Sequence, residues 1–137
     1  MSAFSVHKFG GSSLANVECF KRVFNIISQL PKRSDSFFVL SAMAGVTDRL
    51  VSALNYAKNQ NIEYKNALVQ LRNLHMDTLH NLAPDYLKKF QSDLDSDLGL
   101  IESALKTILA AEDYTEEQFE YVTSFGELWS TWMMVYF

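Results

Sequence analysis

The sequence predicts an α/β fold in which parallel strands alternate with helices. Residues 4–8 and 37–41 are strand-like, and the second segment begins with a short apolar run that we expect to be buried. Between them, apolar residues recur every three or four positions from Leu14 to Ile27, which indicates an amphipathic helix over about residues 13–30. A strand, a helix and a strand joined at this spacing form a right-handed βαβ unit. The two segments should therefore be neighbouring parallel strands of a three-layer α/β arrangement, with the helix packed on them.

The turn after the first strand, Lys8-Phe9-Gly10-Gly11-Ser12-Ser13, has the composition of an anion site. Adjacent glycines let the backbone approach a ligand closely, and Ser12 or Ser13 can cap the next helix, whose free amide hydrogens and dipole favour an anion. Lys8 adds a positive charge beside the turn. Taken alone, a Gly-Gly-Ser run is more often an ordinary turn, and its spacing matches neither G-x-G-x-x-G nor the P-loop. The turn is a candidate for binding phosphate, with an ordinary turn as the alternative.

Small residues follow the second strand, from Ser41 to Asp48. Thr47 or Asp48 can cap the helix that comes next, so on local grounds Ser41 and Thr47 are equally well explained as turn and cap residues. Parallel strands end at the same edge of a sheet, where ligands of open α/β sheets gather. We therefore expect residues 8–12 and 41–47 to line one cleft.

The segment from about residue 61 to residue 113 is helical throughout. Apolar residues recur at helical spacing in three runs, at 68–79, 87–94 and 98–108, and Pro84 suits the first turn of a helix. We interpret this segment as a helical insertion.

No residues in this segment predict a metal site. His75 and His80 are five positions apart, so they do not share the helix face that a metal-binding pair needs, and we expect surface or packing roles for them. Asp93, Asp95 and Asp97 alternate as in a calcium loop but lack its remaining ligands, which favours a solvated acidic helix end.

The last part of the chain is helical and strongly apolar. Residues 115–118, Thr-Glu-Glu-Gln, have the form of a capping box, and the pattern is then interrupted at Ser124-Phe125-Gly126. Glu127 would open a new helix, where its carboxylate could merely favour the helix dipole. Residues 128–137 are apolar almost all round, and such a helix requires more protein around it. We therefore expect a homo-oligomer formed through residues 128–137.

The composition excludes several classes of protein. The 137 residues are 48% hydrophobic and 20% charged, as in a single globular domain. The net charge is −4 and no Lys/Arg stripe is present, which argues against nucleic acid or an anionic membrane as the main partner. No apolar run approaches the ~20 residues of a membrane span, and a single Cys19, expected in the core, allows no disulfide framework. The cytoplasm is the expected compartment.

Three stretches together resemble the aspartate kinases, a family of the amino acid kinase fold. They are Lys8-Phe9-Gly10-Gly11-Ser12-Ser13, residues 40–48 (Leu-Ser-Ala-Met-Ala-Gly-Val-Thr-Asp) and Ser124-Phe125-Gly126-Glu127-Leu128-Trp129-Ser130. The resemblance spans the whole chain. It implies transfer of the ATP γ-phosphoryl group to the β-carboxylate of L-aspartate, with Mg²⁺ accompanying ATP, as the first step towards lysine, threonine and methionine.

The same resemblance assigns roles to residues of the first turn. Lys8 matches the family's catalytic lysine, whose charge would offset the negative charge that builds up on the transferring phosphoryl group. The ATP phosphates would be bound by Lys8, Gly10, Gly11 and Ser12.

The resemblance also assigns the aspartate-binding residues. Ser41 and Thr47 match positions that hold the substrate, and Glu127 matches the glutamate that pairs with its α-ammonium group. The family's nucleotide-binding half and its regulatory ACT domains have no counterpart in residues 1–137. We therefore expect an N-terminal lobe that is inactive by itself and holds no tightly bound cofactor. The alternatives are a non-catalytic binding or assembly module derived from the same lobe, or another amino acid kinase.

Overall fold

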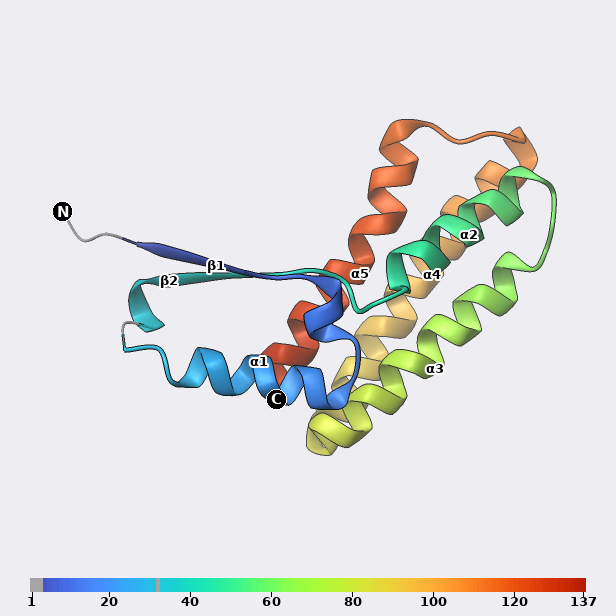
Figure 1. Cartoon of the computed structure of the whole chain (residues 1–137). Helices are drawn as coiled ribbons and strands as arrows, with labels where there is room; N and C mark the ends of the chain where they lie inside the picture. The colour runs from blue at the N-terminus through green and yellow to red at the C-terminus, as the bar shows by residue number, and fades with distance from the viewer. Residues whose placement is uncertain (1–3, 32) are drawn as a thin grey trace.

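The computed structural model describes residues 4–31 and 33–137, apart from the Arg33 side chain, and shows a short sheet that extends to one side of a helical bundle (Figure 1). The elements, in chain order, are strand β1 (Ser5–Phe9), the 3₁₀ turn η1 (Gly11–Leu14), α1 (Val17–Ser28), the 3₁₀ turn η2 (Arg33–Asp35), strand β2 (Ser36–Leu40), α2 (Val46–Lys58), α3 (Tyr64–Leu82), the 3₁₀ turn η3 (Pro84–Tyr86), α4 (Leu87–Ala111) and α5 (Glu116–Tyr136).

The two strands pair in parallel, with Ser5 opposite Ser36 and Phe9 opposite Leu40. This confirms the βαβ unit and the α/β class. The expectation that the apolar run of the second strand is buried is wrong for Phe37 and Val39, which are exposed. α1 and the C-terminal turns of α5 lie on the same side of the sheet (Figure 1). The other side exposes apolar side chains, namely Phe4, Val6, Phe37 and Val39.

The start of α1 differs from the expectation because the 3₁₀ turn η1 lies between the glycines and the helix. Neither Ser12 nor Ser13 caps α1. The N-cap is Asn16, whose Oδ1 accepts a hydrogen bond from the backbone N–H of Cys19 at 3.0 Å. Cys19 itself is half-buried rather than part of the core.

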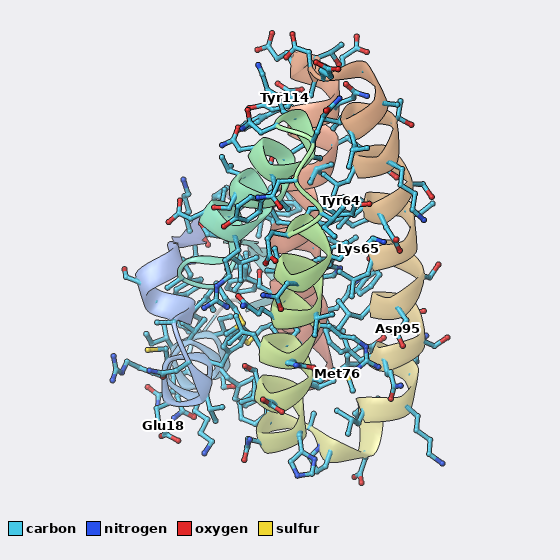
Figure 2. The ribbon with its side chains drawn as sticks, turned by 90° about the vertical axis from the view of Figure 1, so that its right-hand side faces the viewer. Glu18, Tyr64, Lys65, Met76, Asp95 and Tyr114 are labelled. Atoms are coloured by element: carbon cyan, nitrogen blue, oxygen red, sulfur yellow. The ribbon has the colours of Figure 1, made fainter. Side chains whose placement is uncertain are left out.

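Residues 61–113 contain only helices and a 3₁₀ turn among their ordered elements, and Pro84 lies in the first turn of η3 as expected. Figure 2 shows α3 and α4 side by side, with Lys65 on α3 and Asp95 on α4. Asp95 pairs with Arg72 of α3, the Nε–Oδ1 distance being 2.6 Å. The two apolar runs expected as separate helices at 87–94 and 98–108 form one helix, α4, because a single buried stripe continues through both. That stripe consists of Phe90, Leu94, Leu98, Ile101, Leu105 and Ile108.

The aspartates and histidines of this segment have structural surroundings. Asp95 and Asp97 lie within α4, so the expectation of an acidic helix end is wrong. Trp129 Nε1 donates a hydrogen bond to Asp97 Oδ2 at 2.9 Å. His75 is fully buried, lies edge-on to Trp129 and has its Nδ1 2.7 Å from the Leu71 carbonyl oxygen, whereas His80 is exposed.

α5 is one continuous helix. It begins with the predicted capping box between Thr115 and Gln118. The expected interruption at residues 124–126 does not occur, so Glu127 lies in the middle of a helix and not at its start. The preference of a carboxylate for a helix N-terminus therefore does not explain Glu127.

The apolar end of α5 is covered by this chain more completely than expected. Trp129, Met133 and Met134 are buried, while Leu128 and Val135 are exposed, Val135 to 75%. Phe137 packs against Phe24 of α1 with ring centroids 4.9 Å apart. The apolar surface that stays open is centred on the sheet and on Val135, and not on the whole 128–137 segment.

Candidate functional site

The loops that follow β1 and β2 lie against each other at the carboxyl edge of the sheet. The Ser41 N–H donates to the Phe9 carbonyl at 3.0 Å, which continues the parallel pairing past the strand ends. A Cβ added to Gly11 would lie 3.2 Å from the Ala42 carbonyl oxygen, so a side chain at residue 11 would crowd the second loop. Glycine at this position therefore permits the close approach of the two loops.

α5 reaches the same place from the other end of the chain. A Cβ on Gly126 would lie 2.9 Å from Ala42 Cβ and 3.0 Å from Val46 Cγ1, distances too short for a real side chain. One turn later, Ser130 Oγ donates to the Ser41 carbonyl oxygen at 2.5 Å. The loop after β1 and the helix α5, which are far apart in the sequence, thus both converge on Ser41 and Ala42.

The start of α2 is set by Gly45. Its φ of +76° is left-handed, a conformation that favours glycine, and it precedes the first helical residue, Val46. The expectation that Thr47 or Asp48 caps this helix is wrong, because both lie inside its first turn and the N-cap position is Gly45. The Thr47 side chain is exposed and is therefore free to meet a ligand.

A pocket of about 210 Å³ lies between the start of α2 and one face of α5. α2 contributes Thr47, and α5 contributes Glu120, Thr123, Ser124 and Glu127, whose spacing places them on one helix face. The hydroxyls of Thr123 and Ser124 donate to carbonyls of their own helix. Within residues 4–31 and 33–137, neither glutamate side chain has a hydrogen bond or an ion pair. The pocket thus offers unpaired carboxylates and a threonine hydroxyl, a combination suited to an ammonium group.

Lys8 and the glycine turn lie on the sheet side of this region. Lys8 is exposed, opposite Val39 in the register, and has no ion pair in the part of the chain that the structure describes. Ser12 is exposed as well, and the Ser13 N–H closes the turn by donating to the Gly10 carbonyl at 3.0 Å. None of these residues lines the pocket that contains Thr47 and Glu127.

The sequence-based candidates consequently form two groups. The glycine-turn group is Lys8, Gly10, Gly11 and Ser12, and the pocket group is Thr47 and Glu127. Ser41 connects them, since its N–H bonds to β1 and its carbonyl accepts from α5.

Sequence reasoning missed four residues of the site, namely Glu120, Thr123, Ser124 and Ser130. Three of them precede Glu127 by seven, four and three positions, so they would have been found had α5 been foreseen as one helix. Ser130 lies four positions after Gly126 and hence on the same face.

The described residues contain no group of three or more His, Cys, Asp or Glu side chains placed to hold a metal ion. In the same part of the chain, no helix combines the length and apolar character that crossing a membrane requires.

Comparison with known proteins gives consistent results. The model of the amino acid kinase family matches residues 3–137. The chain is 34% identical over 134 residues to the maize (Zea mays) bifunctional aspartokinase/homoserine dehydrogenase 1, chloroplastic. The matched region covers 97% of this chain but only 14% of that protein. It is 33% identical over 129 residues to aspartokinase 2, chloroplastic, of Arabidopsis thaliana, covering 92% of this chain and 23% of that protein.

A solved structure shows the same fold. Escherichia coli aspartokinase III in complex with aspartate and ADP superposes with a TM-score of 0.81 at 26% identity, over 98% of this chain and 28% of that one. The present chain therefore spans roughly a seventh to a quarter of the length of the relatives it matches.

Proposed function

The chain belongs to the amino acid kinase family, and from this premise we propose that it forms the aspartate-facing part of an aspartate kinase. The reaction is transfer of the γ-phosphoryl group of ATP to the β-carboxylate of L-aspartate. The proposal draws on relatives named as aspartokinases and on a similar structure described as containing aspartate and ADP. Because the chain is 14% and 23% of the length of two such relatives, the activity is that of a longer protein.

The observation that carries the proposal is the pocket shared by Thr47 and Glu127. Glu127 is exposed and unpaired among the described residues, so its carboxylate is available to the α-ammonium group of the substrate. The Thr47 hydroxyl can donate to a substrate carboxylate. Ser41, held between β1 and α5, completes the aspartate-binding set.

The glycine turn supplies the phosphate side of the reaction. Lys8 offsets the charge on the transferring phosphoryl group, and Gly10, Gly11 and Ser12 present backbone amides to the ATP phosphates. A β-carboxylate oxygen of aspartate forms a bond to the γ-phosphorus while the bond to the β,γ-bridging oxygen breaks, giving 4-phospho-L-aspartate and ADP. Mg²⁺ accompanies ATP, and no residue of this chain is assigned as its ligand.

The product of this reaction would enter the synthesis of lysine, threonine and methionine. The cytoplasm is the compartment that we propose for it.

A titration of the isotope-labelled chain with L-aspartate, followed by NMR, tests the proposal. We expect resonances of Ser41, Thr47 and Glu127 to shift, and the shifts to be much smaller with succinate, which lacks the ammonium group. Glu127→Gln should abolish the preference for L-aspartate, because an amide cannot replace the charge. Equal responses to both compounds, or shifts located elsewhere, would rule out the proposed site.

A further inference from the structure

Ser130 differs from the other hydroxyl-bearing residues in the long helices. It is fully buried, and its Oγ lies 2.5 Å from the carbonyl oxygen of Ser41, which is 89 positions away in the sequence. The same Oγ lies 3.1 Å from the carbonyl oxygen of Glu127, one turn back in α5. A hydroxyl has one hydrogen to donate, and the shorter distance assigns it to Ser41.

Helix geometry alone does not account for this arrangement. Ser103 of α4 and Thr131 of α5 donate only to carbonyls of their own helices, at 3.0 Å and 2.8 Å. An alanine at residue 130 would bury no polar atom, whereas the serine buries a hydroxyl that needs a partner. The distinguishing contact of the Ser130 hydroxyl is therefore its hydrogen bond to the Ser41 carbonyl oxygen, outside α5.

The two carbonyl groups next to Ser130 belong to residues that the proposed function places on the substrate. Ser41 follows β2, and Glu127 lines the pocket with Thr47. Gly126, which lies beside Ala42, lets α5 approach closely enough for the bond to form. The buried hydroxyl of Ser130 thus lies next to the backbones of both proposed aspartate-binding residues, Ser41 and Glu127.

We propose that Ser130 is a positioning residue of the aspartate site, an inference that rests on the proposed function. Its hydrogen bond fixes the register of α5 against the segment after β2, and thereby the separation between Glu127 and the Ser41–Thr47 loop. Ser130 does not touch the substrate. It acts through Ser41 and Glu127.

Ser130→Ala removes the hydroxyl and leaves the Ser41 carbonyl without its donor. We expect L-aspartate binding to weaken about tenfold, because Glu127 and the Ser41–Thr47 loop are then no longer held at the separation that the substrate requires. We also expect the preference for L-aspartate over D-aspartate to fall, because that preference depends on how the ammonium and carboxylate contacts are placed. A merely structural role would leave the preference intact in the folded protein.

The experiment compares the dissociation constants of both enantiomers for the wild type, Ser130→Ala and the matched control Ser103→Ala, measured by NMR titration of the chain. Ser103→Ala removes a hydroxyl of the same kind from an exposed helix face and should bind like the wild type. Ser130→Cys replaces the hydroxyl with a larger and weaker donor and should also bind L-aspartate less tightly and less selectively than the wild type, which provides a second variant if the alanine form fails to fold.

The outcomes separate the two proposals. If the wild type does not bind L-aspartate, the proposed function fails and this inference fails with it. If the wild type binds and either Ser130 variant shows the wild-type affinity and enantiomer preference, only the positioning role is refuted. Weaker binding with reduced preference in the Ser130 variants and an unchanged Ser103→Ala supports it.

Discussion

Two glycines within long helices should respond in opposite directions to replacement by alanine. In a helix interior, alanine is favoured over glycine by about 0.8–1 kcal/mol. Gly99 of α4 is exposed, and a Cβ there would meet no atom within 4 Å. We therefore expect Gly99→Ala to stabilise the fold by about 1 kcal/mol.

Gly126 of α5 has the same intrinsic preference but a different neighbourhood. An added Cβ would lie 2.9 Å from Ala42 Cβ, 3.0 Å from Val46 Cγ1 and 3.5 Å from Leu50 Cδ1. Overpacking of this kind costs about 1–3 kcal/mol, and Ala42 belongs to a loop whose backbone cannot retreat by rotating a side chain. Subtracting the helix gain leaves a net destabilisation of up to about 2 kcal/mol, and the rigid neighbours place the expected value towards that upper end.

Thermal unfolding followed by circular dichroism measures both effects. A change of 1 kcal/mol corresponds to a shift of about 3–5 °C in Tm for a domain of this size. Adding Ala42→Gly to Gly126→Ala removes the nearest clashing atom and should recover part of the loss. Shifts of the same sign for Gly99→Ala and Gly126→Ala would show that helix propensity, and not the approach of α5 to Ala42, decides the choice of glycine.

Three further predictions concern pH, catalysis and assembly. Burial lowers the pKa of His75 to about 4 from its ordinary value of 6.5, so the unfolded chain binds the proton more readily. The neutral His75 side chain therefore contributes about 3 kcal/mol to the free energy of unfolding. This contribution is complete above pH 6.5 and is lost as the pH falls towards 4. Urea unfolding at several pH values should show this slope, and His75→Phe should remove it. The chain alone should show no aspartate-dependent ATP consumption in a coupled assay, because phosphoryl transfer requires both substrates to be positioned together; turnover abolished by Lys8→Ala would contradict this. Self-association should proceed through the open surface where Val135 adjoins Phe37 of β2. Val135→Glu should favour the monomer in sedimentation, whereas the control Val69→Glu, at an exposed position of α3, should not. A wild-type monomer at micromolar concentration would refute the interface.

The parts of the fold that the sequence predicted are those decided by local chemistry. Periodic apolar residues indicated α1, a capping box indicated the start of α5, and the connection length indicated parallel strands, all of which the structure contains. The predictions that failed concern positions whose structure is determined by a contact with a residue far away in the sequence. Gly126 was interpreted as a helix breaker because glycine is locally unfavourable in a helix, but it lies against Ala42, 84 residues earlier in the chain.

The same reasoning explains why three of the five pocket residues, Glu120, Thr123 and Ser124, were missed. Glu120 and Thr123 are recognised as sharing a helix face with Glu127 only when α5 is treated as one helix. The expected break at Gly126 separated them from Glu127. Ser130 lies in the third stretch that resembles the aspartate kinases, but no local pattern around a serine in an apolar helix identifies its hydrogen-bond partner.

Ala42 shows how the two halves of the proposed site depend on one another. Gly11 lies against its carbonyl oxygen and Gly126 against its Cβ, so the glycine turn and α5 contact opposite parts of the same residue. A Cβ added at Gly11 would lie 3.2 Å from the Ala42 carbonyl oxygen, and one added at Gly126 would lie 2.9 Å from the Ala42 Cβ, so a side chain at either glycine would push against Ala42. Ala42 thus lies between the glycine turn and the part of α5 that carries Glu127. A larger side chain at position 42 would press on α5 at Gly126, and we expect it to displace α5, and Glu127 with it, from the loop that follows β2.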